Sequence, residues 1–499
     1  MRILLRTAAL FCVITMGLAA TLQAADPVKE AEAFKKLGDE HIAKDELRQA
    51  ADSYEQALSL GRNQFTADEC VRMAVVLSWD DRLPAAIREL RFVVERDPAN
   101  QNARVQLARI YSWDGQFTRA VGIADSILAN SPDDKETLIV KANALEWDDR
   151  FDEAIPIYRG IIDRDGDFDA RIGLAFSLLY KGDRAAALRE IETLAAGDDR
   201  ERRQLQRLSD AIARETRPRM EIGYDFYSDS DESHAGRYWA RSGFAVGNHD
   251  FSAEVGRRDA SGGLRADDVS FRADFNATGV LGAAAGLGVT RLMGADTAQF
   301  PTGFVRLHGR LHRTSIIGMM STEILSETSE LIANRVRRFS TGGEISHRIR
   351  PLWSVGGAYN HFRFSDQNAA NDAQVRTEVA MHVAPRIAFG YQLRFLDYDT
   401  QSGSGYFDPD NFVSHRLSGS VELDRRKFFV FVQVYGGHQK FERNDFRTSE
   451  WVKGGRASFG IKFSKNLTVG VSIAGSDFST GSVSGYRYFT TGTKVSYQF

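Results

Sequence analysis

The sequence ends in Thr493-Lys494-Val495-Ser496-Tyr497-Gln498-Phe499. Within this stretch, Val495, Tyr497 and Phe499 alternate with polar residues. A period of two residues is typical of a β-strand that has one apolar face and one polar face. The stretch therefore predicts a strand whose apolar face carries two aromatic rings.

The same alternation continues through the sequence from Pro218 onward. Sixteen alternating runs can be counted there, and turn-forming segments separate them. The runs start near Arg219, Arg237, His249, Val269, Leu281, Gly303, Ser315, Arg338, Leu352, Gln374, Arg386, His415, Phe428, Trp451, Leu467 and Arg487. In one of them, Val305 and Leu307 oppose Arg306 and His308. The second half of the chain is therefore predicted to consist of strands that each have one apolar face.

The predicted connections alternate in length, which favours a membrane barrel over a sandwich in water. Short ones are predicted at 247–248, 278–279, 313–314, 349–351, 384–385, 424–427 and 464–466. Long polar ones are predicted at 229–236, 258–268, 326–335, 365–373 and 399–414. An even number of strands places both barrel ends on the short-turn rim, which faces the periplasm in outer-membrane barrels. Residues 216–499 are therefore predicted to form a transmembrane antiparallel β-barrel of about sixteen strands.

The first half of the chain repeats with a period near 34 residues. Trp79, Trp113 and Trp147 are spaced by 34 residues, and Tyr180 follows after 33. Repeats are predicted to start near Ala31, Ala67, Gln101, Lys135 and Phe168, and a polar capping helix is predicted over 198–214. Each helical hairpin leaves one apolar face uncovered, so the hairpins are expected to stack.

The repeat that ends at Pro132 resembles the tetratricopeptide repeat. Leu107-Ala108, Tyr111 and Gly115 stand at signature positions of that family. The predicted fold class is therefore multi-domain, α then β. An N-terminal tetratricopeptide α-solenoid over residues 26–215 precedes the C-terminal barrel.

The recurring aromatic residues Trp79, Trp113, Trp147 and Tyr180 allow two interpretations. Each Trp lies two residues beyond the packed position that Tyr111 represents, about 200° around the helix. The rings could line a groove and stack on sugar rings or on a peptide. Packing between repeats is the alternative, and it is the favoured interpretation.

Residues 1–25 have the pattern of a secretory signal peptide. Arg2 and Arg6 precede the apolar stretch 7–22, and small residues follow it. The stretch is shorter than the roughly 20 apolar residues that a spanning helix needs. Removal of the signal leaves Cys70 as the single cysteine, so neither an intramolecular disulfide nor a cysteine-based metal site is expected.

Composition and motifs argue against nucleic-acid binding and catalysis. The formal net charge is -3 and no basic block is present, so nucleic acid is not an expected partner. No hydrolase motif, metal-binding motif or phosphate loop is found, so no catalytic residue, cofactor or metal is predicted. His308 and His312 lie four residues apart, which on a strand is about 13 Å and too far to share a metal.

A barrel of this size leaves room for an aqueous channel. The predicted substrate path on its inner face comprises Trp239, Arg306, His308, Arg310, Arg376, Arg394 and Arg416. In the favoured interpretation, the inward arginines pair with nearby carboxylates and stiffen the wall. In the other, they line a hydrated path for an anionic or neutral polymer.

The whole architecture resembles bacterial exopolysaccharide secretion proteins, such as the outer-membrane exporters of cellulose and of poly-N-acetylglucosamine and the smaller YaiO-type barrels. The string 405–412, Gly-Tyr-Phe-Asp-Pro-Asp-Asn-Phe, resembles a segment of the cellulose exporter's barrel. Tyr497 and Phe499 resemble the terminal signal that the barrel assembly machinery recognises. Five repeats are far fewer than in the cellulose exporter, which favours a YaiO-like or uncharacterised exporter.

This resemblance implies a protein of the outer membrane of a Gram-negative bacterium, with the repeats in the periplasm. It implies porin-like export of an exopolysaccharide, with the repeats guiding the polymer or recruiting partners. The implied partners are outer-membrane lipid, the barrel assembly machinery, polysaccharide, and periplasmic secretion or synthase proteins. The alternative is a non-transporting scaffold or surface receptor with a plugged barrel.

Overall fold

The computed structural model describes residues 26–276, 280–350, 352–383, 385–478 and 486–499. The predicted signal peptide, residues 1–25, lies outside the described residues. The chain divides into two compact units, one up to Gly173 and one from Leu174 to Phe499. Each unit is described by itself.

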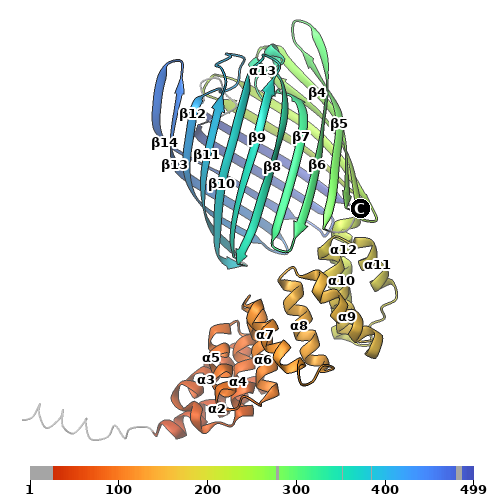
Figure 1. Cartoon of the computed structure of the whole chain (residues 1–499), viewed down its shortest axis with the longest axis vertical. Helices are drawn as coiled ribbons and strands as arrows, with labels where there is room; N and C mark the ends of the chain where they lie inside the picture. Colours follow the sequence, from red (N-terminus) through yellow and green to blue (C-terminus); the bar gives the residue numbers. More distant parts are fainter. Residues whose placement is uncertain (1–25, 277–279, 351, 384, 479–485) are drawn as a thin grey trace, which may run out of the picture. The chain divides into compact units, whose positions relative to one another are not determined.

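The first unit consists of antiparallel helix pairs (Figure 1). Its helices are α2 (Pro27–Ala43), α3 (Leu47–Gly61), the 3-10 turn η1 (Arg62–Gln64), α4 (Ala67–Trp79), α5 (Leu83–Arg96), α6 (Gln101–Trp113), α7 (Phe117–Leu128), α8 (Lys135–Trp147) and α9 (Phe151–Asp165), and α10 (Phe168–Lys181) crosses into the second unit. The predicted repeat starts at Ala67, Gln101, Lys135 and Phe168 coincide with the first residues of α4, α6, α8 and α10. The first helix begins earlier than predicted, at Pro27, because the Asp26 side chain caps it by accepting from the Val28 amide.

The recurring tryptophans mark the ends of three of these helices. Trp79, Trp113 and Trp147 are the last residues of α4, α6 and α8. Each is followed by an aspartate, and the next residue, such as Asp81 or Gly115, takes a left-handed conformation with φ near +63° or +73°. A left-handed residue after a helix reverses the chain and starts the next helix.

Small residues form the contact between neighbouring helices of the first unit. Ala74, Ala86, Ala120 and Ala154 are fully buried. Alanine side chains at these places allow close packing of the helix axes. Cys70 is also buried, and burial raises the pKa of its thiol to about 11. The thiol therefore stays protonated and unreactive at neutral pH.

Among the helices that the structure describes, none is long and apolar enough to cross a membrane.

The second unit contains the last helices and all the described strands. Its other helical segments are α11 (Arg184–Glu192), α12 (Asp199–Thr216), η2 (Ser261–Gly263) and α13 (Ser329–Asn334). Its strands are β1 (Arg219–Asp229), β2 (His234–Val246), β3 (His249–Ala260), β4 (Leu264–Asn276), β5 (Leu281–Met293), β6 (Thr297–Leu311), β7 (Thr314–Ile324), β8 (Arg337–Arg350), β9 (Trp353–Phe364), β10 (Ala369–Val383), β11 (Arg386–Tyr398), β12 (Asp410–Asp424), β13 (Phe428–Arg443), β14 (Phe446–Lys462), β15 (Leu467–Phe478) and β16 (Tyr486–Gln498).

The strands form a closed barrel, as the sequence predicted. Each strand pairs antiparallel with its neighbours in sequence, and β1 pairs with β16, so the described residues form sixteen strands without a free edge. The Phe499 amide donates to the Pro218 carbonyl at 2.9 Å and extends this seam. Closure satisfies every strand's hydrogen-bonding groups, which is the condition for crossing a bilayer with strands.

The prediction of regularly alternating long connections was wrong in most places. Of the described connections, only 325–336 and 399–409 are long, and they form one rim with short loops between them. Within 258–268, for instance, only η2 separates β3 from β4. The strands continue through polar sequence because cross-strand ion pairs form on them. Arg257 pairs with Asp267 at 2.8 Å and Arg265 pairs with Asp259 at 2.8 Å.

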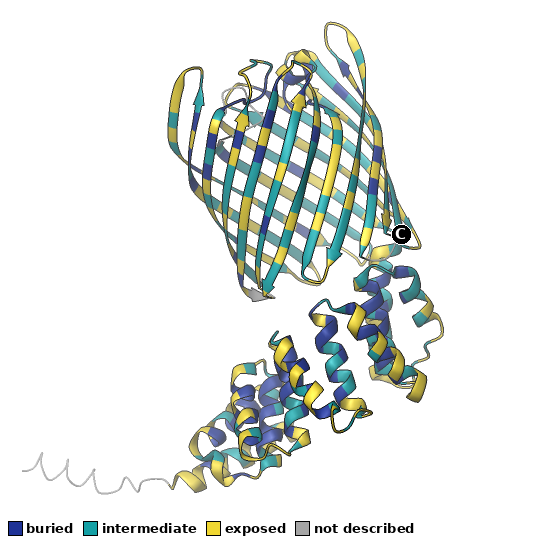
Figure 2. Ribbon diagram, in the orientation of Figure 1, coloured by how far each residue is buried: buried dark blue, intermediate teal, exposed yellow. Residues whose placement is uncertain are grey.

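The two faces of the barrel wall differ in polarity. Large apolar side chains such as Phe271, Leu307 and Leu417 are more than 60% exposed and alternate with inward polar residues. Exposed and less exposed positions alternate along the strands in Figure 2. An outward apolar surface around a closed antiparallel barrel is the architecture of outer-membrane proteins. The chain is therefore an outer-membrane barrel protein with a helical N-terminal part.

Candidate functional site: the barrel lumen

The predicted path residues all lie on inward-facing strand positions, but they form no single cluster. Arg306, His308 and Arg310 follow one another on β6, near its short-turn end. Trp239 is on β2, and Arg376, Arg394 and Arg416 are on β10, β11 and β12. The register between neighbouring strands places Arg376 beside Gln392, and Gln392 beside Arg416. The path residues on β10, β11 and β12 are therefore neighbours, whereas Trp239 and the β6 residues lie on other parts of the wall.

Several of these side chains are held by neighbours on the wall. Arg306 donates to Asp274 at 2.9 Å and Arg394 to Asp372 at 2.8 Å, while Arg376 pairs with Glu344. Trp239 donates through its ring N–H to Asp225 at 2.8 Å, and His308 contacts Asn276 at 3.2 Å. For these arginines, the geometry agrees with the interpretation that they pair with carboxylates.

The inward arginines also stack on aromatic rings. Among the described residues, the guanidinium carbon lies 5.1–6.0 Å from the centre of a ring on the strands in six pairs, which are Arg241–Trp239, Arg272–Phe304, Arg338–Phe362, Arg394–Phe412, Arg416–Tyr435 and Arg456–Phe431. A guanidinium over a ring face is favourable because the face is electron-rich. The wall thus presents planar cationic and aromatic groups side by side, a pattern that the sequence does not reveal because it depends on strand register.

A cavity of about 800 Å³ lies at the short-turn end of the lumen. Its lining includes the seven arginines Arg184, Arg214, Arg217, Arg219, Arg241, Arg272 and Arg306 and the five acidic residues Glu215, Asp250, Glu254, Asp274 and Glu323. The excess of arginine gives this mouth a positive potential.

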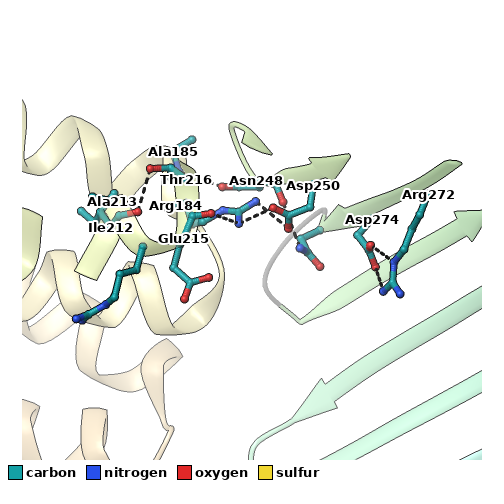
Figure 3. A network of polar contacts seen from close by, with 12 residues as sticks. Arg184, Ala185, Ile212, Ala213, Glu215, Thr216, Asn248, Asp250, Arg272 and Asp274 are labelled. Atoms are coloured by element: carbon teal, nitrogen blue, oxygen red, sulfur yellow. Dashed lines mark hydrogen bonds and ion pairs between the residues drawn. The ribbon is translucent and has the colours of Figure 1, made fainter. Parts of the chain in front are cut away.

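Helices α11 and α12 are fixed to the short-turn rim by polar contacts (Figure 3). Arg184 donates to both carboxylate oxygens of Asp250 at 3.0 and 3.2 Å and to the Glu215 carbonyl at 3.2 Å. The Asn248 side chain accepts from the Ala185 amide at 3.0 Å and donates to Asp183 at 3.1 Å. A two-pronged guanidinium–carboxylate contact restrains orientation as well as distance.

At the long-loop mouth, two segments, α13 and the connection 399–409, pack against inward-facing residues of the strands. Leu331 of α13 and Tyr406 and Phe407 of the connection are buried in one apolar cluster. The strands contribute inward residues to it, among them Phe364, Leu396, Phe412, Phe441 and Val452. Figure 1 shows α13 at this rim of the barrel. The connection 399–409, named the closing segment, contains residues 405–409 of the string that resembles part of the cellulose exporter.

A buried ion pair holds the closing segment in place. Asp408 is 1% exposed and lies 3.2 Å from the Arg443 guanidinium, which also stacks over Phe407 at 5.1 Å. The same carboxylate accepts from the Ser402 amide at 2.5 Å. Asp408 therefore ties the closing segment both to itself and to β13.

Tyr406 adds a second polar anchor. Its hydroxyl donates to Asp366 at 2.8 Å and accepts from Asn368 at 3.1 Å, and its ring stacks on Phe364 with centres 4.6 Å apart. Burial raises the pKa of the Tyr406 hydroxyl. The hydroxyl therefore stays protonated and remains a donor at physiological pH.

The recurring aromatic residues of the helical part are exposed. Trp79, Trp113 and Trp147 are 58%, 40% and 43% exposed, so their rings are not buried between repeats. Tyr180, in the second unit, is 55% exposed and stacks on Phe176. The favoured packing interpretation does not account for this exposure.

Tyr497 and Phe499 lie on the outward face at the barrel seam. Their ring centres are 5.0 Å apart in an edge-to-face arrangement, and both rings are exposed on the protein surface.

In the part of the chain that the structure describes, no group of three or more His, Cys, Asp or Glu side chains could hold a metal ion.

The profile of the tetratricopeptide repeat family matches residues 80–144. The helical part of the chain carries tetratricopeptide repeats. No curated protein sequence is detectably similar to the chain. Among solved structures, a bacterial polysaccharide outer membrane secretin is 12% identical, with 57% of this chain and 99% of that chain covered and a TM-score of 0.46.

Two other solved structures are similar to parts of the chain. CdiB from Acinetobacter baumannii is 9% identical, with 56% of this chain and 60% of that chain covered and a TM-score of 0.39. A tetratricopeptide repeat protein from Parabacteroides merdae is 19% identical, with 39% and 74% covered and a TM-score of 0.34.

Proposed function

We propose that the protein exports a polysaccharide across the outer membrane through its barrel, with the tetratricopeptide repeats in the periplasm. The observation that carries this proposal is the lumen lining. Arginine–aromatic pairs surround it, and a basic cavity of about 800 Å³ forms its short-turn mouth. Aromatic faces suit the apolar faces of sugar rings, and guanidinium groups suit their oxygens. On this proposal, Trp239, Arg306, His308, Arg310, Arg376, Arg394 and Arg416 line the substrate path.

The repeats serve in this proposal as a guide for the polymer or as a docking site for periplasmic secretion or synthase proteins. The outward apolar surface contacts outer-membrane lipid. Tyr497 and Phe499 form the signal for the barrel assembly machinery. The protein acts in transport, and catalysis belongs to its partners.

Deletion of the gene is expected to abolish the extracellular polymer, and expression from a plasmid is expected to restore it. The measurement is the hexose and uronic acid content of the culture supernatant and of the cell surface. The purified protein should also conduct ions in planar bilayers, at least transiently. Unchanged extracellular polymer together with no conductance would sink the transport proposal.

The closing segment favours a second candidate, a non-transporting scaffold or surface receptor with a plugged barrel. Phe407 and Asp408 are each 1% exposed, which indicates a well-packed plug. If the closing segment is a permanent plug, weakening it leaves the conductance unchanged, whereas weakening a gate raises the conductance.

The exposed tryptophans give a separate prediction. Replacing Trp79, Trp113 and Trp147 with alanine is expected to lower polymer export several-fold without lowering the amount of barrel in the outer membrane. The rings contribute little to stability because they are 40–58% exposed, so a loss of export would reflect lost contacts. Val28→Ala with Leu60→Ala, at other exposed apolar positions of the same unit, is the control. Normal export by the triple variant would exclude a role for the rings.

A further inference from the structure

Many arginines of the lumen pair with a carboxylate. Those that pair with a carboxylate are Arg237, Arg241, Arg272, Arg306, Arg338, Arg376, Arg386, Arg394 and Arg443. Arg416 and Arg456, on β12 and β14, have no carboxylate within ion-pair distance among the residues that the structure describes. The wall around β13 therefore carries two positive charges that the protein leaves uncompensated.

Both charges lie on aromatic rings of β13. Arg416 is 5.2 Å from the centre of Tyr435, and Arg456 is 5.1 Å from the centre of Phe431. In the strand register, Arg416 pairs with Gly437 and Arg456 pairs with Gln433. These partners are four residues apart on β13, so the two arginine positions are about 13 Å apart along the strand. They form successive contact points rather than one cluster.

Glycines on β14 make room for the inward rings of β13. A Cβ atom on Gly454 would collide with Tyr435, and one on Gly460 would collide with Phe429. The rings therefore lie over the backbone of the neighbouring strand instead of projecting across the lumen. Rings against the wall, with guanidinium groups over two of them, make an extended surface along which a chain molecule can pass.

The guanidinium groups have unused donors. The Nε of Arg416 is buried and has no hydrogen-bond partner within the described part of the chain. Arg456 donates through Nε to Gln433 at 2.9 Å, a neutral acceptor that leaves its charge in place. A buried donor without an acceptor carries a desolvation cost.

We infer that Arg416 and Arg456, with Tyr435, Phe431 and Phe429, form a binding track for an anionic glycan whose sugars carry carboxylates. Each guanidinium fork matches a carboxylate through two parallel hydrogen bonds. The rings beside it contact the apolar faces of the sugars. Two contact points in sequence hold the chain while letting it advance, because neither alone binds it tightly. The track rests on the proposed function only for the statement that its ligand is the exported polymer.

Isothermal titration of the full-length protein in detergent micelles with hexagalacturonate tests this inference, and cellohexaose is the neutral probe. The double substitution Arg416→Gln and Arg456→Gln should weaken hexagalacturonate binding at least about tenfold, which corresponds to roughly 1.4 kcal/mol. Arg416→Lys with Arg456→Lys should give an intermediate loss, because lysine keeps the charge but not the fork. Faster migration of unheated protein in SDS gels verifies that each variant is folded.

Arg386→Gln is the matched control, because Arg386 is a lumenal arginine on β11 that pairs with Glu378 and belongs neither to the ring pairs nor to the cavity lining. It should change the dissociation constant of hexagalacturonate by less than about twofold, which is well below the tenfold change expected of the double glutamine variant. An equal loss in this control would overturn the track in favour of a general positive field. Unchanged binding in the double glutamine variant would also overturn it.

Cellohexaose separates the anionic from the neutral interpretation. If cellohexaose binds as tightly as hexagalacturonate, and only Tyr435→Ala with Phe431→Ala abolishes its binding, the track takes neutral glycans and the inference is wrong. Titration with purified protein does not depend on export. Loss of the proposed function in cells and loss of this binding are therefore distinguishable results.

Discussion

Asp408→Ala is expected to open the long-loop mouth of the lumen, so that the barrel conducts ions. Asp408 is 1% exposed and Arg443 is 14% exposed, so the substitution removes a carboxylate from a largely buried guanidinium. Breaking such a pair typically costs about 3–5 kcal/mol. The cost falls on the closed state alone, because an open segment exposes both groups to water.

A cost of about 3 kcal/mol would change the ratio of closed to open states by more than about a hundredfold. The open fraction in planar bilayers should rise accordingly, and large antibiotics should enter cells that carry the variant. Asp408→Asn should give a smaller rise, because the amide still accepts from the Ser402 amide.

Asp399→Ala provides the control, because Asp399 is an exposed carboxylate in the same connection. It should leave conductance at the wild-type level. If folded Asp408→Ala protein conducts no more than wild type, the closing segment does not gate the lumen. The plugged scaffold would then be the better description of this protein.

The barrel and the repeats could be predicted from sequence because each follows from a local period. Alternation in β6, with Leu307 opposite Arg306, needs no knowledge of any other strand. The repeat starts at Ala67 and Gln101 coincide with helix starts because the 34-residue period carries the turn chemistry with it. Local patterns of this kind fix element type and number.

The closing segment could not be predicted because its burial depends on strands far away in sequence. Phe407 packs edge-to-face on Phe441 with ring centres 5.2 Å apart, and Asp408 pairs with Arg443. In the sequence, the connection reads as polar and turn-rich, which is typical of an exposed loop. In the sequence, the string 405–412 stands out only because it resembles a segment of the cellulose exporter's barrel.

Strand register explains why only part of the lumenal site can be predicted from the sequence. Inward arginines such as Arg394 and Arg416 follow from alternation, but whether each one meets a carboxylate depends on its neighbours. Arg394 lies diagonally across from Asp372 on β10 and donates to it, whereas the register partners of Arg416 are Gln392 and Gly437. The difference between a structural arginine and one available to a ligand is therefore a property of paired strands.

Replacing Tyr497 and Phe499 with serine is expected to lower the amount of folded barrel in the outer membrane several-fold. These rings lie outward on the strand that closes the barrel, and burial of each in lipid contributes about 1.5–3 kcal/mol. The seam pairs Arg219 with Gln498, which is the greatest sequence separation between paired strands. Its closure therefore has the largest entropic cost of any strand pairing in the barrel. Immunoblots of outer-membrane fractions, heated and unheated, measure the folded amount.

A matched control separates recognition by the assembly machinery from lost apolar burial. Ile473→Ser with Phe489→Ser removes two outward apolar side chains, 52% and 48% exposed, from β15 and β16 away from the terminal residues. If assembly depends on a terminal aromatic signal, this control should accumulate to a clearly higher level than the Tyr497/Phe499 variant. Equal losses would mean that apolar surface alone decides insertion. A signal that is read before folding should also slow assembly of the terminal variant without changing its resistance to urea once it is folded, because recognition affects the rate of insertion and not the stability of the closed seam.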